Sequence, residues 1–193
     1  MSDIAIFPGT FNPVHKGHLL ISEQACSQFE LKKVYFVLSP NPPNKLNQTN
    51  ILPASSRAEL LQAALKNNHN FELSLIELER ENASYTFETV EYFRNKFNLE
   101  GRLKLILGFD TFLSLPSWRR IEEMKKLTHF LIAPREDDCF EIELESFYDD
   151  VYFDFIDSPL IDISSSEVRK RKKQRANYEN LLSSEVFELY RAI

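Results

Sequence analysis

The sequence predicts an α/β fold in which an open parallel sheet carries helices on both faces, followed by C-terminal helices. Short apolar runs alternate with longer amphipathic stretches along the chain, and this alternation is typical of βαβ units with a parallel sheet. The first run, residues 4–7, leads through a glycine-containing turn directly into a helical stretch. The pattern is Rossmann-like, and such sheets bind ligands at the carboxyl ends of their strands, where the strand order reverses.

Each predicted element rests on a local pattern. The helix expected over residues 16–29 has Ile21, Ala25 and Phe29 at every fourth position, as an amphipathic helix does. Strands are expected at short apolar runs, and residues 40–53, rich in Pro and Asn, are expected to form a loop. The predicted strands are residues 4–7, 34–38, 71–78, 103–107 and 129–133, with shorter extended pieces at 151–156 and 160–163. The predicted helices are residues 16–29, 55–67, 86–97, 116–126, 165–174 and 183–192.

Length and composition favour one globular domain in a reducing compartment. A chain of 193 residues fits one domain, so residues 1–193 are expected to form a single unit. Cys26 and Cys139 lie far apart, without CxxC or zinc-site spacing, and are interpreted as ordinary thiols. No apolar stretch approaches the roughly 18 residues of a membrane span, and no basic segment precedes an apolar run at the N-terminus. We therefore expect a cytoplasmic protein that does not enter a membrane.

The charge balance argues against a broad nucleic-acid surface but not against a small phosphate ligand. The formal net charge is −6, whereas nucleic-acid binding depends on clustered Lys and Arg. One basic cluster, residues 169–175, is compact, and its ordinary interpretation is a solvated helix face. The sequence leaves the oligomeric state open, and a homo-oligomer is compatible with it.

The turn after the first strand has the features of a phosphate site. Gly9 allows the backbone to come close to a ligand, with N–H groups that can point at phosphate oxygens. The next helix begins near Lys16 or Gly17, so the positive end of its dipole faces the same place. His15 and His18 are three residues apart. If the first turn is helical they project to one side, where each can donate a hydrogen bond to phosphate.

Other interpretations of this segment fit less well. A structural zinc ion needs three or four ligands, and the metalloprotease HExxH pattern has a different spacing and a Glu that this segment lacks. The segment is also neither a P-loop nor a dinucleotide-binding GxGxxG motif. We therefore expect no protein-bound metal site here.

Residues 9–19 read G-T-F-N-P-V-H-K-G-H-L and resemble the signature G-T-F-D/N-P-I/V-H-x-G-H-L of the HxGH nucleotidylyltransferases. The signature is long and position-specific. The resemblance implies that His15 and His18 contact the phosphates of ATP, and that the backbone of Gly9, Thr10 and Phe11 supports them.

A second segment, residues 163–169, reads I-S-S-S-E-V-R and resembles I-S-S-T-x-I/V-R of the same superfamily. Its serines can cap a helix and form an anion site. Arg169 lies one turn into that helix, where it can clamp phosphate oxygens. The resemblance implies that Ile163, Ser164, Ser165 and Arg169 bind ATP.

Three segments between the signatures resemble bacterial nicotinate-nucleotide adenylyltransferases. Residues 42–45 read P-P-N-K, similar to P-P-H-K, and residues 84–90 read S-Y-T-F-E-T-V, similar to S-Y-T-x-D-T-L/V. Residues 107–110 and 115–118 match L-G-x-D and L-P-x-W, and an indole can stack on a flat pyridine ring. The implied site for nicotinate mononucleotide consists of Asn12, Lys45, Tyr85, Thr86, Asp110 and Trp118, while Gly108 and Asp110 are implied to contact ATP.

The resemblance runs from about residue 4 to 190 and implies adenylyl transfer in NAD biosynthesis. The 5′-phosphate of nicotinate mononucleotide would attack the α-phosphorus of ATP, giving nicotinate adenine dinucleotide and pyrophosphate. The nucleophile is already an anion, so no protein base is required, and catalysis rests on positioning and charge stabilisation. His15, His18, Lys45 and Arg169 are expected to supply these, with a Mg²⁺ ion carried by the ATP phosphates.

Some alternatives remain open at this stage. The acceptor could be the amide, nicotinamide mononucleotide, or another phosphate compound. Phosphopantetheine adenylyltransferases share the first signature, but they are shorter and lack the S-Y-T and L-P-x-W segments. A non-catalytic nucleotide-binding regulator on the same scaffold would have less need of His15, His18 and Arg169 together. His69 and His129 lie away from both motifs and are expected to be structural.

Overall fold

A parallel sheet forms the centre of the molecule. The computed structural model describes residues 3–40, 51–80, 85–134, 146–158 and 163–193. The strands are β1 (Ile4–Gly9), β2 (Lys33–Leu38), β3 (Phe71–Ser74), β4 (Leu103–Gly108), β5 (Thr128–Ala133) and β6 (Phe153–Phe155). The helices are α1 (Lys16–Gln28), α2 (Ala54–Leu65), α3 (Thr86–Lys96), α4 (Phe109–Leu113), α5 (Ile121–Leu127), α6 (Ser165–Lys173) and α7 (Ser184–Ala192). Short 3-10 turns lie at η2 (Leu115–Ser117), η3 (Ser146–Tyr148) and η4 (Glu179–Leu181).

The strand order reverses at β1. The six strands are arranged β3-β2-β1-β4-β5-β6, and every neighbouring pair is parallel. β1 lies between β2 and β4, with Ile6 opposite Tyr35 on one side and Leu105 on the other. This arrangement confirms the predicted Rossmann-like α/β fold. Because the strand order reverses at β1, the turn that follows β1 lies where sheets of this kind bind their ligands.

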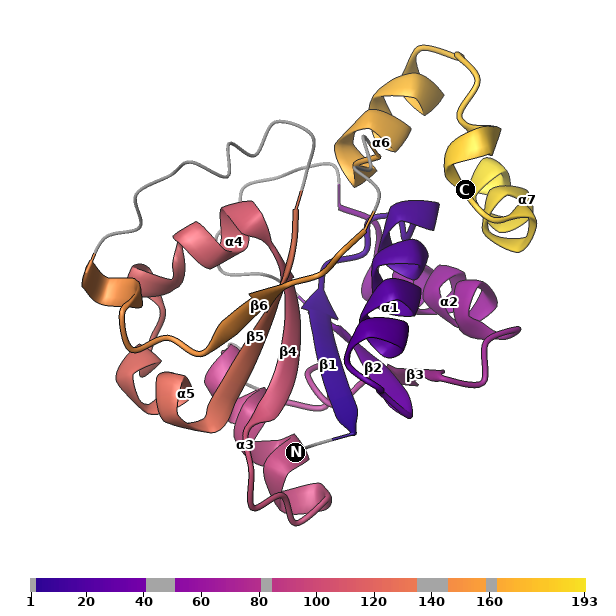
Figure 1. Cartoon of the computed structure of the whole chain (residues 1–193). Helices are drawn as coiled ribbons and strands as arrows, with labels where there is room; N and C mark the ends of the chain where they lie inside the picture. Colours follow the sequence, from indigo (N-terminus) through magenta and orange to yellow (C-terminus); the bar gives the residue numbers. More distant parts are fainter. Residues whose placement is uncertain (1–2, 41–50, 81–84, 135–145, 159–162) are drawn as a thin grey trace.

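Two apolar cores cover the two faces of the sheet. Successive strand residues point to opposite faces, so in β1 Ala5 and Phe7 join the core formed with α1, α2 and α7. Ile4 and Ile6 join the other core, formed with α3, α4 and α5. Figure 1 shows these two groups of helices on opposite sides of the sheet. The predicted covering of both faces is therefore confirmed.

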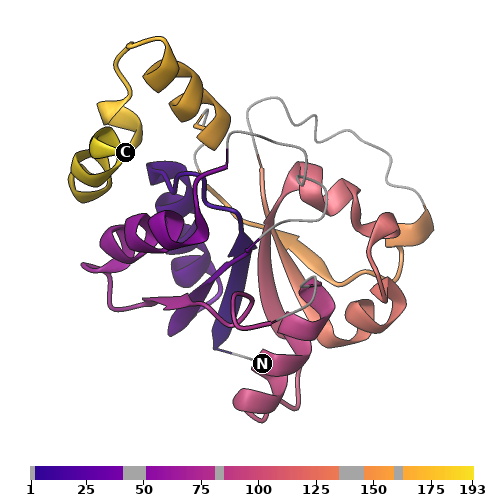
Figure 2. The same cartoon turned by 180° about the vertical axis from the view of Figure 1, so that it is seen from behind.

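The C-terminal helices extend one of these helical layers. Figures 1 and 2 show α6 and α7 on the side of α1 and α2, at the end of the sheet to which β1 points. α7 packs on α2, and its Val186 and Tyr190 belong to the same core as Leu60 of α2. None of the helices in the described ranges combines the length and apolar character that crossing a membrane requires.

Most predicted elements occur close to their predicted bounds, with one clear exception. The prediction of one continuous helix over residues 116–126 was wrong. The chain there first forms η2, Trp118 then has an extended backbone (φ −77°, ψ 139°), and α5 begins only at Ile121. Arg120 takes the left-handed conformation, with φ 57°, which interrupts any continuous helix. β3 also ends at Ser74 rather than at residue 78, and the predicted piece at 160–163 lies mostly outside the described residues.

Candidate active site

A cavity of about 760 Å³ opens at the carboxyl ends of β1 and β4, where the strand order reverses. A volume of roughly 300–1,000 Å³ is typical of small-molecule sites. Its walls come from the ends of β1, β4 and β5 and from the N-terminal regions of α1, α3 and α6. The lining includes Gly9, Thr10, Phe11, Asn12, His15, His18, Thr86, Gly108, Trp118, Ile163, Ser164, Ser165 and Arg169.

The turn after β1 is shaped by the ring of Phe11. Phe11 has a positive φ of 45°, and its ring, only 2% exposed, meets Phe7 and His18 edge-on. A Cβ atom added to Gly9 would lie 2.9 Å from the Phe11 ring. Gly9 is thus required for packing inside the turn as well as for access to a ligand. A Cβ on Gly108 would meet nothing within 4 Å, so this position opens toward the cavity.

His15 and His18 form a stacked pair at the start of α1. His15 is the N-cap, with an extended backbone (φ −143°, ψ 168°), and its backbone N–H donates to His18 Nδ1 at 3.2 Å. The ring centroids lie 3.6 Å apart with an interplanar angle of 28°. Because His18 Nδ1 accepts this bond, the neutral ring carries its proton on Nε2. Both histidines line the cavity, as the spacing predicted.

The N-terminus of α6 docks directly onto the segment that follows β1. Ser164 caps α6 by accepting from the backbone N–H of Glu167 at 3.1 Å, as predicted for a Ser-rich helix start. The Ser165 hydroxyl donates to the Pro13 carbonyl at 2.9 Å. The Arg169 guanidinium donates to the Asn12 carbonyl at 2.7 Å and to the Ser166 hydroxyl at 3.1 Å. The two sequence motifs, far apart in the chain, are therefore in contact at the cavity.

The residues expected to bind the acceptor are only partly gathered at the cavity. Thr86 and Trp118 line it, and the Trp118 indole N–H donates to the Ser114 hydroxyl at 3.2 Å. Asn12 also lines it, although its side-chain oxygen accepts from the backbone N–H of Leu52 at 3.0 Å. Tyr85, the N-cap of α3, and Asp110, which is exposed in the first turn of α4, are not among the lining residues. Lys45 lies outside the described residues.

Comparison with known proteins decides the family. The cytidylyltransferase-like family model matches residues 6–171. The nicotinate-nucleotide adenylyltransferase of Bacillus subtilis (strain 168) is 33% identical over 186 residues, covering 96% of this chain and 94% of that protein. A protein of Exiguobacterium sibiricum, named a probable nicotinate-nucleotide adenylyltransferase, is 34% identical over 186 residues, with the same two coverages of 96% and 94%. This chain belongs to the nicotinate-nucleotide adenylyltransferases.

A solved structure supports the fold of this adenylyltransferase. The nicotinic acid mononucleotide adenylyltransferase of Plasmodium falciparum, solved in complex with NaAD, superposes with a TM-score of 0.75 at 18% identity. The alignment covers 98% of this chain and 94% of the Plasmodium chain. At this identity the likeness establishes the common fold, which agrees with the strand order described above.

Arg57 binds the backbone of two residues that line the adenylyltransferase cavity, Thr10 and Ser39, but this role was not predicted from the sequence. Its side chain is 1% exposed, and burial lowers the pKa of its guanidinium. The guanidinium donates hydrogen bonds of 2.7–3.0 Å to four backbone carbonyls, those of Thr10, Ser39, Pro40 and Leu52. Arg57 thus ties the turn after β1 to the end of β2 and to the segment before α2. The sequence did indicate that Arg57 is buried. It stands three and four residues before Leu60 and Leu61, which places it on the apolar face of α2.

Glu77 is a second residue that the sequence analysis missed. Its side chain is 3% exposed and accepts from the Thr89 hydroxyl at 2.7 Å and from the Ser39 hydroxyl at 2.9 Å. Arg80 also donates to the Thr89 hydroxyl, at 3.0 Å. Since Ser39 lines the cavity, Glu77 connects the cavity wall to α3. No local pattern distinguishes it from an ordinary charged residue.

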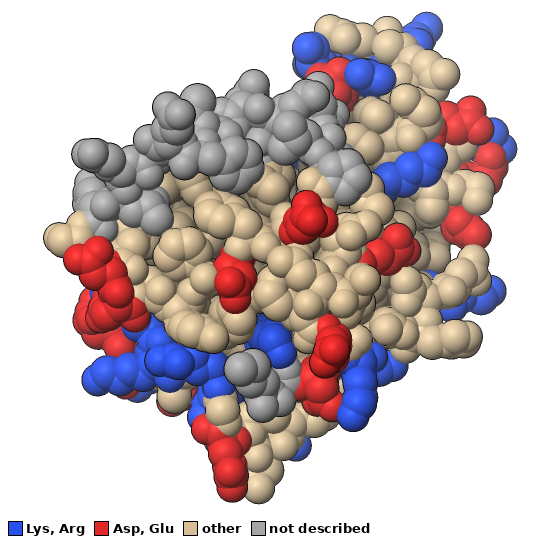
Figure 3. All heavy atoms as spheres, in the orientation of Figure 1, with Lys and Arg blue, Asp and Glu red and all other residues tan. Residues whose placement is uncertain are grey.

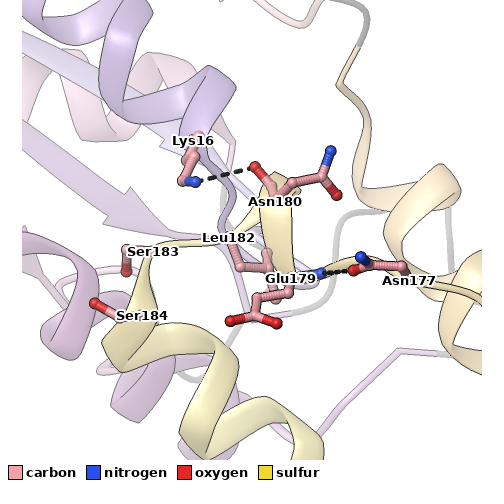
Figure 4. A pocket seen from close by; sticks show the side chains of 7 residues that line it. All are labelled: Lys16, Asn177, Glu179, Asn180, Leu182, Ser183 and Ser184. Atoms are coloured by element: carbon pink, nitrogen blue, oxygen red, sulfur yellow. Dashed lines mark hydrogen bonds between the residues drawn. The ribbon is translucent and has the colours of Figure 1, made fainter.

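Lys16 belongs to the first motif but does not line the cavity. Its ammonium group donates to the backbone carbonyl of Asn180 at 3.0 Å, and Figure 4 shows the side chain directed toward η4. There it borders a separate, open pocket of about 630 Å³, with Asn177, Glu179 and Ser183 among its other lining residues. Lys16 therefore connects α1 to the C-terminal segment.

The basic cluster in α6 is largely engaged within the protein. Glu167 forms ion pairs with Arg171 at 2.7 Å and with Lys170 at 3.7 Å. Lys172 donates to the backbone carbonyl of Tyr190, and Arg169 contacts Asn12 as described. Figure 3 shows acidic spheres beside basic ones at the end of the molecule that α6 occupies. The cluster is therefore a solvated helix face only in part: Lys170, Lys173 and Arg175 are exposed, whereas Arg169 and Lys172 bind backbone carbonyls of other segments.

Proposed function

We propose that this enzyme transfers the adenylyl group of ATP to nicotinate mononucleotide, releasing pyrophosphate, as a step of NAD biosynthesis. The observation that carries the proposal is the direct contact of the two motifs, in which Arg169 and Ser165 bind the backbone of Asn12 and Pro13 beside the His15–His18 pair. This contact concentrates cationic and N–H donors at one end of a cavity large enough for a small-molecule substrate. A triphosphate is the ligand that such a donor set suits best.

The chemistry requires positioning and charge stabilisation more than proton transfer. The attacking phosphate is already an anion, so its oxygen forms the new bond to the α-phosphorus while the bond to the leaving pyrophosphate breaks. We assign His18 Nε2–H and the remaining N–H donors of Arg169 to the phosphate oxygens, where negative charge develops. A guanidinium has five N–H donors, and the bonds to Asn12 and Ser166 use two of them.

A Mg²⁺ ion is part of the proposal and would arrive with ATP. Within the described ranges, no group of three or more His, Cys, Asp or Glu side chains is placed to hold a metal. We therefore assign the ligands of the ion mainly to the phosphates. Bound there, it would neutralise charge on the triphosphate and on the departing pyrophosphate.

For the acceptor, we propose that Trp118 stacks on the pyridine ring and that Tyr85, Thr86 and Asp110 surround it, with Lys45 and Asn12 near its phosphate. Trp118 and Thr86 both line the cavity and come from different elements, and an indole is a suitable surface for a flat ring to stack on. We also propose that residues 1–193 act as one catalytic domain in the cytoplasm.

The test is pyrophosphate release by the purified full-length chain. ATP and Mg²⁺ are supplied with nicotinate mononucleotide, nicotinamide mononucleotide or phosphopantetheine as the acceptor. We expect release with nicotinate mononucleotide and much less with the other two. Preference for the amide or for phosphopantetheine would reassign the acceptor, whereas ATP binding without release in any reaction would favour a nucleotide-binding regulator.

A further inference from the structure

We propose that Glu77 is a positioning residue for acceptor binding, because its buried carboxylate connects two of the segments that line the cavity. The carboxylate joins Ser39, which follows β2 and lines the cavity, to Thr89 in α3, one turn after the cavity-lining Thr86. These two hydrogen bonds are called the Ser39–Glu77–Thr89 bridge below. The inference rests on the proposed function, in which Thr86 is assigned to the acceptor.

The bridge is buried, and each oxygen of the carboxylate has its own donor. Glu77 is 3% exposed, and Thr89 is completely buried. The Thr89 hydroxyl donates to Glu77 Oε1 at 2.7 Å, and the Ser39 hydroxyl donates to Oε2 at 2.9 Å. Because a carboxylate removed from water without donors is costly, these two bonds hold Ser39 and Thr89 in one defined arrangement.

The Ser39 end of the bridge is also fixed by contacts that do not involve Glu77. The backbone N–H of Ser39 donates to the Gly9 carbonyl at 2.9 Å, and the Ser39 carbonyl accepts from Arg57 at 2.8 Å. These backbone bonds keep Ser39 beside the turn after β1 when the carboxylate is removed. We therefore expect the phosphate end of the cavity to depend little on Glu77.

At the other end, the bridge belongs to a set of polar contacts around the first turn of α3. The Thr89 hydroxyl accepts from Arg80 at 3.0 Å. The backbone N–H of Tyr85 donates to Glu88 Oε2 at 3.1 Å, and Arg80 lies 4.0 Å from the same oxygen. Thr86 is therefore in a turn that polar contacts hold on both sides.

Apolar packing alone does not define the position of Thr86. The next residue, Phe87, belongs to the core on this face of the sheet. Such packing is not directional, so it permits small rotations that the directed hydrogen bonds of the bridge prevent. Without Glu77, the turn that carries Thr86 has to be ordered when the acceptor binds, and this ordering lowers the affinity. Acceptor binding should weaken while ATP binding is retained.

The experiment measures KM for nicotinate mononucleotide and KM for ATP, each with the other substrate and Mg²⁺ at saturation, by pyrophosphate release. Glu77→Ala removes the bridge, Thr89→Val removes only its α3 end, and Thr89→Ser keeps the hydroxyl. Thr128→Val is the matched control, because the buried Thr128 hydroxyl has no hydrogen-bond partner among the described residues. Thr128 begins β5, at the end of the sheet opposite the cavity. Urea unfolding of each variant gives its stability.

We expect Glu77→Ala and Thr89→Val to raise KM for nicotinate mononucleotide by roughly five- to tenfold, as when about one side chain has to be ordered on binding. KM for ATP and kcat should stay within about twofold of the unmodified enzyme, because the phosphate end is held separately. Thr89→Ser and Thr128→Val should keep both KM values within about twofold. If Glu77→Ala does not fold, Thr89→Val decides, since it leaves the bond between Glu77 and Ser39 in place.

Two results would overturn the inference. If Glu77 only supports the fold, Glu77→Ala and Thr89→Val lower the free energy of unfolding while both KM values stay those of the unmodified enzyme. An equal rise of both KM values would show that the effect is not confined to the acceptor. Either result leaves the proposed function intact, whereas absence of pyrophosphate release by the unmodified enzyme defeats the proposed function itself.

Discussion

The Arg169 guanidinium donates a 2.7 Å hydrogen bond to the backbone carbonyl of Asn12, which lies 157 residues earlier in the chain. The bond joins the N-terminal turn of α6 to the turn after β1, so Arg169 has a structural and a proposed catalytic role at once. A second hydrogen bond, from Ser165 to the Pro13 carbonyl at 2.9 Å, supports the same contact. The structural role can therefore be separated from the catalytic one by substitution.

Arg169→Lys is expected to lower kcat by at least about tenfold. A lysine keeps the charge but cannot bind the Asn12 carbonyl and a phosphate through one planar fork. Loss of one charge-assisted hydrogen bond, about 1.5–3 kcal/mol, corresponds to tenfold or more in rate. Ser165→Ala is the control: it removes the other bond between the same two segments and should lower kcat much less. Equal losses in both variants would mean that Arg169 acts only by docking α6.

His18→Ala is expected to lower kcat by at least about 10²-fold, the effect of removing one strong transition-state donor. The KM for ATP should change less, because the bond is proposed to strengthen as charge develops on the phosphates. His69→Ala is the matched control, since His69 is exposed and lies away from the cavity. Turnover within a few-fold of the unmodified enzyme would remove His18 from the catalytic role.

Gly9→Ala is expected to lower the stability of the protein, whereas Gly108→Ala is expected to weaken ATP binding. At Gly9 the new Cβ would lie 2.9 Å from the Phe11 ring, and overpacking of this kind costs about 1–3 kcal/mol of unfolding free energy. At Gly108 the Cβ meets nothing within 4 Å, so stability should change by less than about 0.5 kcal/mol while the KM for ATP rises. Chemical denaturation and steady-state kinetics measure the two effects. The opposite pattern, a stable Gly9→Ala and an unstable Gly108→Ala, would contradict the assignment.

Arg57→Lys is expected to destabilise the protein by roughly 3 kcal/mol or more. A single ammonium group cannot reach four carbonyls that a planar guanidinium satisfies from several directions, and buried carbonyls left unpaired cost about 1–3 kcal/mol each. Arg191→Lys is the control, because Arg191 is paired with Glu188 at 2.6 Å on the surface of α7, where the change should be within about 1 kcal/mol. Equal stability of the two variants in urea would show that the bonds of Arg57 are not needed.

The sequence predicted the parts of this fold and site that local patterns determine. β1, the start of α1 and the Ser-capped start of α6 each follow from a short run of residues. The break at Arg120 could not be predicted, because its left-handed backbone is accompanied by contacts with Phe87 and Glu123, one of which comes from a distant helix. The role of Arg57 was missed for a related reason: its partners are backbone carbonyls from three separate segments, and a carbonyl leaves no signature in a sequence.

His129→Gln is expected to make the protein less sensitive to acid. The pKa of His129 is lowered by burial, which outweighs the opposing effect of Asp154, whose carboxylate lies 2.8 Å from His129 Nε2. Below the ordinary pKa of about 6.5, the unfolded chain binds a proton at this position more readily than the folded protein does. Stability from this group is therefore complete above that pH and decreases as the pH falls toward the pKa of the folded state. Urea denaturation between pH 7.5 and pH 5 measures the slope, which should be smaller in His129→Gln than in the unmodified protein. An equal slope in His129→Gln and the unmodified protein would show that His129 does not contribute to it.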